Sequence, residues 1–315
     1  MRWLIVILLV LALGWSIYWF VAAEGTRRGF NAALDQARAQ GWQVDTTGVS
    51  TRGFPNRLDT TLGDIGLTSP DGALSVRAAF VQILSLSYRP THVIALLPEE
   101  IALTVGGQPV QITNSDLRAS LSLSATPDLP LQQMRFVAEA PALTLPDGSR
   151  LSARALRAAL TDADAPNYRL GFAANELALA PLPGETIELT LDAMLRLDKP
   201  LDRHVAQSPA APVALDLTGL RLAAGDGVRA DLTGQLTWAS GRPQGALTLK
   251  ITNWRGFLQR LEQLGLIAPE VLQGLSAQLP LIAQGADVTL PLPVRNGVVY
   301  VGALPFLWLT PQARG

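Results

Sequence analysis

The side chains that most often perform acid–base chemistry are few and scattered in this sequence. The two histidines, His92 and His204, stand far apart, and the carboxylate pairs Glu99-Glu100 and Asp162-Asp164 lie beside turn residues. Acid–base catalysis needs carboxylates held in a cleft with separated pKa values, whereas carboxylates in turns are normally solvated. The pattern therefore predicts surface loops, and we nominate no catalytic residue.

The sequence also lacks the motifs of nucleophilic, metal and phosphate chemistry. It contains no cysteine, no Gly-x-Ser-x-Gly elbow and no phosphate-binding Gly-x-x-x-x-Gly-Lys loop. With no cysteine and no second histidine near either one, a zinc site is not expected. We therefore expect a protein that is not an enzyme and carries no cofactor or metal, and we rank an unrecognised hydrolase last among the possible functions.

Composition excludes one class of partner and bounds the environment. The net charge is −1, charged residues make up 16% of the chain, and hydrophobic residues make up 48%. Nucleic-acid binding requires a basic patch that displaces counterions from phosphates, so we expect no nucleic-acid partner. The large apolar share is enough for a substantial core, and the absence of cysteine suits an oxidising compartment.

The first 23 residues predict a membrane anchor. Residues 3–23, "WLIVILLVLALGWSIYWFVAA", form 21 uncharged positions, and about 20 apolar residues cross the hydrocarbon core of a bilayer. Aromatic residues such as Trp15, Tyr18 and Trp19 near the end of a span favour the headgroup layer. The expected arrangement is a single pass through the inner membrane with the body in the periplasm.

A cleaved signal peptide is the competing interpretation of the same residues. Val21-Ala22-Ala23 satisfies a small-residue cleavage site, but the apolar stretch is longer than the usual 7–15 residues and carries bulky aromatic side chains beside the cut. Both interpretations place residues 24–315 outside the cytoplasm.

Beyond a linking helix over residues 24–41, which ends at Gly41, the sequence alternates with the period of β-strands. Residues 187–198 ("IELTLDAMLRLD") and 228–238 ("VRADLTGQLTW") place leucines on one face and charged or hydroxyl side chains on the other. Asp-Gly and Asn-Gly pairs at residues 71–72, 147–148, 226–227 and 296–297 are hairpin signals. We therefore predict a mostly β fold: a long antiparallel meander that forms a curved sheet, a sandwich or an open groove.

Two short amphipathic helices are expected near residues 254–279, with Pro269 opening the second. A proline-containing loop, "SPAAPVA" at residues 208–214, separates an N-terminal β region (42–207) from a C-terminal β region (208–315) that carries the helical insert.

Gly53-Phe54-Pro55 and Arg57 interrupt the alternation near the start of the β region. Proline cannot donate to a strand ladder and glycine permits a bend, so we predict a bend between one strand near residues 42–50 and another near 57–67. Phe54 is expected to turn inward as a core plug, while Arg52 and Arg57 stay solvated. Binding of a lipid phosphate by Arg57 is the alternative.

These residues carry a family resemblance. The stretches concerned are the anchor, "GWQVDTTGVSTRGFPNRLD" (residues 41–59), "LSLSYRPTHVIALLP" (84–98) and "VRNGVVYVGALP" (294–305). They resemble an uncharacterised proteobacterial family of membrane-anchored envelope proteins, the domain of unknown function numbered 2125. Members often carry Phe where Asn56 stands. The resemblance implies location and fold style but no reaction, and its architecture is loosely similar to the AsmA-like group.

The function is expected to reside in a surface rather than in a reaction centre. One hypothesis is that the apolar face of the sheet binds or shields lipid acyl chains in envelope maintenance, because burying apolar area yields about 25 cal/mol per Å². The alternative is a structural or protein-interaction scaffold with no ligand cavity. Alternation alone leaves a filled core and an open groove equally possible. The candidate lipid-facing residues are Leu189, Leu191, Leu232, Leu236 and Trp238.

Overall fold

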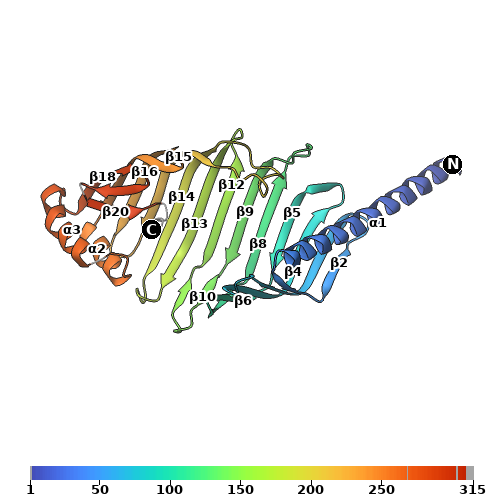
Figure 1. Ribbon diagram of the computed structural model, residues 1–315, viewed down its shortest axis with the longest axis horizontal. Helices are drawn as coiled ribbons and strands as arrows, with labels where there is room; N and C mark the ends of the chain where they lie inside the picture. Colours follow the sequence, from blue (N-terminus) through green and yellow to red (C-terminus); the bar gives the residue numbers. More distant parts are fainter. Residues whose placement is uncertain (1, 268, 303, 310–315) are drawn as a thin grey trace. The chain divides into compact units, whose positions relative to one another are not determined.

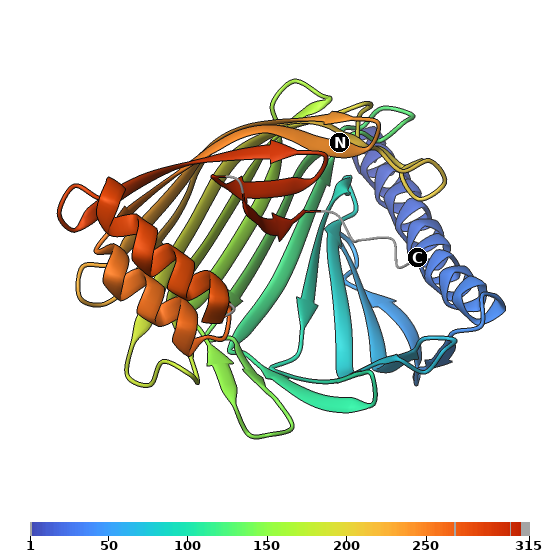
Figure 2. The same cartoon turned by 60° about the vertical axis from the view of Figure 1, so that its left-hand side comes forward.

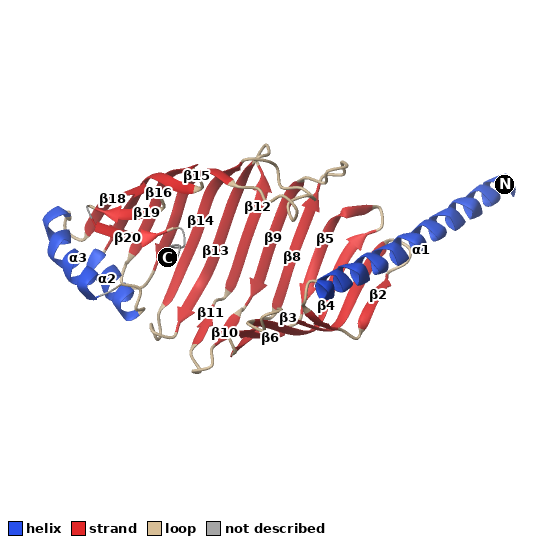
Figure 3. Cartoon of the chain, in the orientation of Figure 1, coloured by secondary structure: helices blue, strands red, loops and turns tan. Residues whose placement is uncertain are grey.

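The structure, a computed structural model, describes residues 2–267, 269–302 and 304–309. Strands predominate (Figure 3), and the described strand pairs are antiparallel, which confirms the expected fold class. Contacts divide the chain into two units: Met1–Ala125 with Phe136–Arg150, and Thr126–Arg135 with Leu151–Gly315. This division differs from the expected one at residues 207 and 208, because the strands on either side of that loop, β14 and β15, pair with each other in the second unit.

The first unit consists of one long helix and strands of 3 to 13 residues (Figure 1). Two further strands, β9 (Leu131–Glu139) and β11 (Arg150–Ser152), contribute residues to both units. The elements of the first unit are α1 (Arg2–Ala39), β1 (Gln43–Asp45), β2 (Gly48–Arg52), β3 (Arg57–Thr68), β4 (Leu74–Leu86), β5 (Arg89–Leu97), β6 (Glu100–Val105), β7 (Gln108–Thr113), β8 (Asp116–Leu123) and β10 (Ala142–Thr144).

Helix α1 joins the expected span and the expected linking helix without a break. It is long and apolar enough to cross a membrane, with a mean hydropathy of 2.5 in its most apolar window. Its N-terminal end runs clear of the strands (Figure 1), whereas Phe30 and Leu34 pack on the apolar face of the sheet against Leu62, Ile65 and neighbouring residues. The C-terminal part of α1 therefore covers apolar strand surface in its own unit.

The second unit is a meander of strands with two helices. Its elements are β12 (Ala155–Asp162), β13 (Asn167–Leu179), β14 (Thr186–Leu197), β15 (Pro212–Ala223), β16 (Arg229–Ala239), β17 (Arg242–Thr252), α2 (Trp254–Gln263), α3 (Pro269–Ile282), β18 (Asp287–Arg295), β19 (Val298–Val301) and β20 (Leu304–Trp308). Both short helices and the opening of the second at Pro269 confirm the expectation.

Register aligns the apolar side chains of the second unit into rows that cross the strands. One row runs Ala158, Phe172, Leu191, Leu220, Leu232, Leu249 and Leu290, each residue paired with the next across the ladder. Leu217 and Leu220 are three positions apart, so strict alternation would place them on opposite faces. A β-bulge at Thr218-Gly219, where two residues of β15 oppose one of β16, keeps both on the same face. All apolar rows therefore stay on one face.

Helices α2 and α3 lie side by side across part of this apolar face (Figure 2). Trp254 and Leu258 of α2 and Leu279 of α3 form one buried cluster with residues of β16, β17 and β18 such as Leu236, Ile251 and Val288. The helices bury this portion of the face because their own apolar stripes need the same shelter from water.

The expected hairpin dipeptides occupy turns. Asp71-Gly72 lies between β3 and β4, and Asp147-Gly148 lies between β10 and β11. Asp226-Gly227 and Asn296-Gly297 each have two residues of positive φ, as a type I′ turn requires. These turns confirm the hairpin prediction.

Arg260 attaches α2 to the turns of the sheet. Its side chain is 11% exposed and lies 2.5 Å from a carboxylate oxygen of Glu185. The guanidinium also donates to the carbonyl of Gly225 at 2.9 Å. The arginine thus ties the helix to the β14 and β15 ends.

We expect Arg260→Ala to lower the free energy of unfolding by about 2 kcal/mol, because charge-assisted hydrogen bonds are lost and Glu185 is left without its partner. Gln259→Ala, an exposed position on the same helix, is the matched control. Denaturant unfolding of the detergent-solubilised chain measures both variants, and equal stability of the two would contradict the attachment role.

Candidate functional site

The residues first considered for chemistry do not assemble into a reaction centre in the described part of the chain. The Nδ1 atom of His92 lies 2.5 Å from Oγ of Ser122, its cross-strand neighbour on β8. His204 lies in an exposed loop, and its Nε2 is 3.8 Å from Asp128. The described residues include no group of three or more His, Asp or Glu side chains placed to hold a metal ion.

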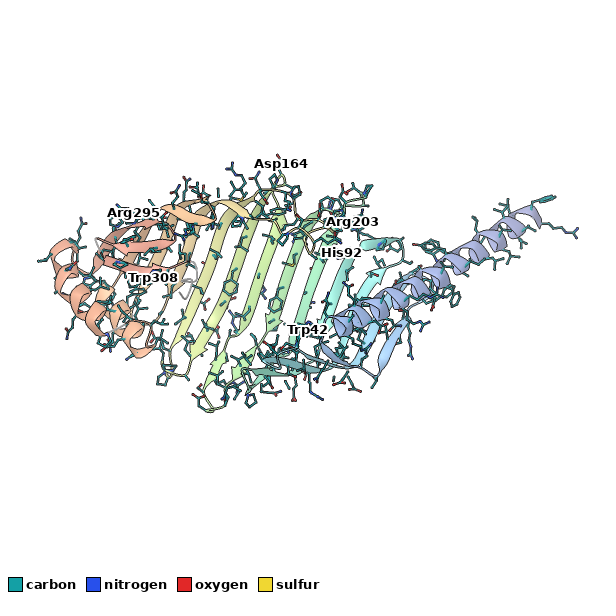
Figure 4. All side chains as sticks on the ribbon, viewed as in Figure 1. Trp42, His92, Asp164, Arg203, Arg295 and Trp308 are labelled. Atoms are coloured by element: carbon teal, nitrogen blue, oxygen red, sulfur yellow. The ribbon has the colours of Figure 1, made fainter. Side chains whose placement is uncertain are left out.

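The carboxylate pairs are on the surface. Glu99, Glu100, Asp162 and Asp164 are all exposed, and Asp164 lies at the outer tip of the turn between β12 and β13 (Figure 4). Their placement agrees with the expectation of solvated turns.

The first candidate surface is the open segment of the apolar face, formed by β12, β13 and β14 of the second unit. Its side chains share the face that α2 and α3 cover farther along, but they lie outside the buried cluster and are partly exposed. The members are Leu156, Leu160, Leu170, Phe172, Leu189 and Leu195.

The five candidate lipid-facing residues all project from this same apolar face, to different depths. Leu189 belongs to the open segment. Leu191, Leu232 and Trp238 are partly exposed and pack against the edge of the helix-covered cluster. Leu236 is only 6% exposed and lies inside that cluster. Leu189 therefore lies outside the buried cluster, whereas Leu236 serves the core.

The opposite face of the same strands is polar. Arg169 of β13 forms a two-pronged pair with Asp192 of β14, with N–O distances of 2.9 and 2.8 Å. The guanidinium holds the pKa of the Asp192 carboxyl below its usual value. Arg221 and Asp231 pair across β15 and β16 at 3.6 Å. Charges of both signs thus keep this face wet, while the other face stays apolar.

A loop closes one end of the apolar face. Tyr168, on the apolar side of β13, is completely buried, and its hydroxyl accepts a hydrogen bond from the backbone N–H of Leu201 at 2.8 Å. Burial raises the pKa of this hydroxyl above its ordinary value. The loop after β14 therefore covers this end of the sheet, whereas Leu170 and Phe172 farther along β13 are partly exposed.

The second candidate surface is the docking corner, defined as residues 53–57 and the β4–β5 turn Ser87-Tyr88. Gly53 has a φ of 110°, and a Cβ there would lie 2.9 Å from the Arg57 carbonyl oxygen. The Arg57 N–H donates to the Gly53 carbonyl at 2.9 Å. The Ser87 N–H donates to the Asn56 carbonyl, also at 2.9 Å. The expected bend is present and joins β2 to β3.

The prediction that Phe54 plugs the core is wrong. Phe54 is 50% exposed and stacks against Phe20, with ring centroids 5.8 Å apart, and edge-on against Trp19 at 5.5 Å. The cause is helix α1, which offers aromatic partners outside the sheet. Arg52 and Arg57 are exposed as expected, and Arg57 pairs with Asp59 at 3.0 Å.

Three aromatic side chains of α1 hold the docking corner by its backbone. The indole N–H of Trp15 donates to the Pro55 carbonyl at 3.0 Å, and that of Trp19 donates to the Arg57 carbonyl at 2.8 Å. The Tyr18 hydroxyl donates to the Ser87 carbonyl at 2.7 Å. Their positions 15, 18 and 19 place these donors on one helical face. In the sequence, the same pattern indicates only aromatic residues at a membrane interface.

We expect Phe54→Ala to cost about 1 kcal/mol, as lost aromatic pairs do, rather than the roughly 3–5 kcal/mol of an emptied core site. A double-mutant cycle with Phe20→Ala should give a coupling energy of about 0.5–1 kcal/mol. Unfolding of the full chain in detergent micelles measures both quantities. A core-sized loss, or additive effects of the two variants, would contradict the exposed stack.

Comparisons with known proteins give one match. No curated protein and no solved structure matches the chain. A family model described as "Uncharacterized protein conserved in bacteria (DUF2125)" matches residues 19–308. This range contains the open segment and the docking corner. The chain therefore belongs to this uncharacterised bacterial family, DUF2125.

Proposed function

We propose that this protein is a non-catalytic, membrane-anchored periplasmic protein that binds or shields lipid acyl chains on the apolar face of its second unit, in maintenance of the envelope. The observation that carries the proposal is the open segment of that face. Its leucines and Phe172 remain partly exposed and lie outside the buried cluster to which Trp254 and Leu258 of α2 and Leu279 of α3 belong.

The energetics favour an apolar ligand on this segment. Each methylene group moved from water to an apolar surface contributes about 0.8 kcal/mol. The rows of side chains cross β12, β13 and β14 at strand spacings of about 4.8 Å, so a chain lying along a row would contact successive leucines such as Leu160 and Leu170. The segment has few polar side chains that would specify a polar ligand.

The contacts of α1 support a retained anchor rather than a cleaved signal peptide. Cleavage after Ala23 would remove Trp15, Tyr18 and Trp19, whose hydrogen bonds hold the docking corner. Trp19 is only 5% exposed and packs with Leu58 of β3. The apolar segment of α1 thus contributes side chains to the folded unit, which favours its retention after export.

The orientation is part of the proposal. The segment before the span carries Arg2, which favours the cytoplasm, and the cysteine-free body suits the periplasm. Because the chain has no cysteine, Ala73→Cys in the exposed β3–β4 turn provides a single reporter. A membrane-impermeant maleimide should label it in intact spheroplasts. Labelling only after lysis would place the body in the cytoplasm and contradict this part of the proposal.

Photocrosslinking in cells tests the lipid proposal. With p-benzoylphenylalanine at Phe172 or Leu189, irradiation should produce covalent lipid adducts, detected by intact-mass analysis of the purified full chain. The matched control is the same residue at Thr190, which neighbours Leu189 but lies on the polar face. Adducts are expected at positions 172 and 189 and not at position 190.

Two results would contradict lipid binding at this surface. The absence of lipid adducts at positions 172 and 189, or equal yields at position 190, would remove the proposal. A protein adduct confined to positions 172 and 189 would instead favour the scaffold function, with a partner protein covering the apolar face.

A further inference from the structure

The position of the docking corner along α1 conflicts with a simple bilayer span. The uncharged segment between Arg2 and Glu24 is 21 residues long, or about 31 Å of helix, which matches the roughly 30 Å hydrocarbon core. The corner, however, is bound to Trp15, Tyr18 and Trp19. Only residues 3–14 precede it, about 18 Å of helix, which is too short to cross the core alone.

The last turns of the apolar segment must therefore enter the membrane together with the corner that they bind. Irregular backbone is costly at membrane depth unless its polar groups are satisfied. The carbonyls of Pro55, Arg57 and Ser87 accept hydrogen bonds from the aromatic side chains of α1. The Ser87 N–H and Oγ both donate to the Asn56 carbonyl. These hydrogen bonds lower the cost of bringing the carbonyls of the corner into the outer layer of a bilayer.

The exposed side chains of the corner suit that layer. Phe54 is 50% exposed, Tyr88 is 65% exposed, and Phe20 of α1, which stacks on Phe54, is 62% exposed. Aromatic rings of this kind are enriched at the boundary between acyl chains and headgroups.

Arginines flank the aromatic group. Arg57 and Arg89 lie on either side of Leu86 in neighbouring strands, and both are exposed. Arg52 is exposed opposite Asp59. Guanidinium groups bind phosphates through paired hydrogen bonds, and long basic side chains reach from the apolar boundary to the headgroups.

We propose that the docking corner is a phospholipid-binding surface that inserts into the headgroup layer of the bilayer crossed by α1. Phe54 and Tyr88 contact the upper acyl chains, and Arg52 and Arg89 contact lipid phosphates. The inference rests on the anchoring part of the proposed function and is independent of acyl-chain binding on the second unit. In this arrangement the start of β3 and the β4–β5 turn stay in contact with the membrane. The first unit is then not merely tethered to the bilayer by α1.

Depth measurements on the full chain in nanodiscs test this surface. Single-cysteine variants Leu8→Cys, Asn56→Cys, Tyr88→Cys and Ala73→Cys carry an environment-sensitive fluorophore. The nanodiscs contain phosphatidylethanolamine and phosphatidylglycerol, with some lipids bearing a spin-label quencher near the headgroup or near the end of the acyl chain. Asn56 and Ala73 are exposed positions at opposite ends of the β3–β4 hairpin and form a matched pair.

The labels at positions 56 and 88 should lose fluorescence with the headgroup-proximal quencher, whereas the label at position 73 should keep it. The label at position 8 should be quenched by the deep quencher. If position 8 is quenched and positions 56 and 88 respond like position 73, the anchor stands and the corner proposal is overturned. If position 8 is not quenched, the anchor itself fails and the corner proposal fails with it.

Discussion

An antiparallel sheet with one apolar face has to shelter that face from water, and this constraint organises both units. In the first unit, Phe30 and Leu34 of α1 cover the strands around Leu62 and Ile65. In the second unit, α2 and α3 cover β16, β17 and β18. The strands beyond these helices keep their apolar side chains partly exposed, which is why the open segment of the second unit is the surface that we associate with lipid.

Apolar and polar side chains stay on separate faces even where the register between neighbouring strands shifts. A shift of one residue would move every following side chain to the other face. The bulge at Thr218-Gly219 prevents this after Leu217, and a second irregularity between Ala174 and Leu177 does the same in β13. Across the sheet, Arg169 and Asp192 pair on the polar face. The apolar and charged surfaces are therefore separated by the thickness of one strand layer.

The docking corner meets a different requirement, which is the attachment of the long apolar helix α1 to the strands of its unit. Indole and phenol donors of α1 bind carbonyl oxygens rather than side chains, so the attachment depends on the backbone path of residues 53–57. Gly53 is needed for this path because a Cβ would collide with Arg57. The Gly-Phe-Pro sequence, which first suggested only a bend, is better understood as the receiving surface for the helix.

Local patterns in the sequence determined the apolar helix, the antiparallel strands, the type I′ hairpin turns and the two amphipathic helices near the C-terminal end. Each follows from short-range periodicity or from the φ preference of residues such as Asn296 and Gly297. They also placed the five candidate leucine and tryptophan residues on one face, since alternation depends only on neighbours. Tertiary structure decided which of them is buried: Leu236 lies inside the cluster that the strands form with α2 and α3, whereas Leu189 lies outside it and is partly exposed. It also decided the role of Phe54, because the aromatic rings that stack on it come from residues more than thirty positions earlier in the chain, and periodicity carries no information over that separation.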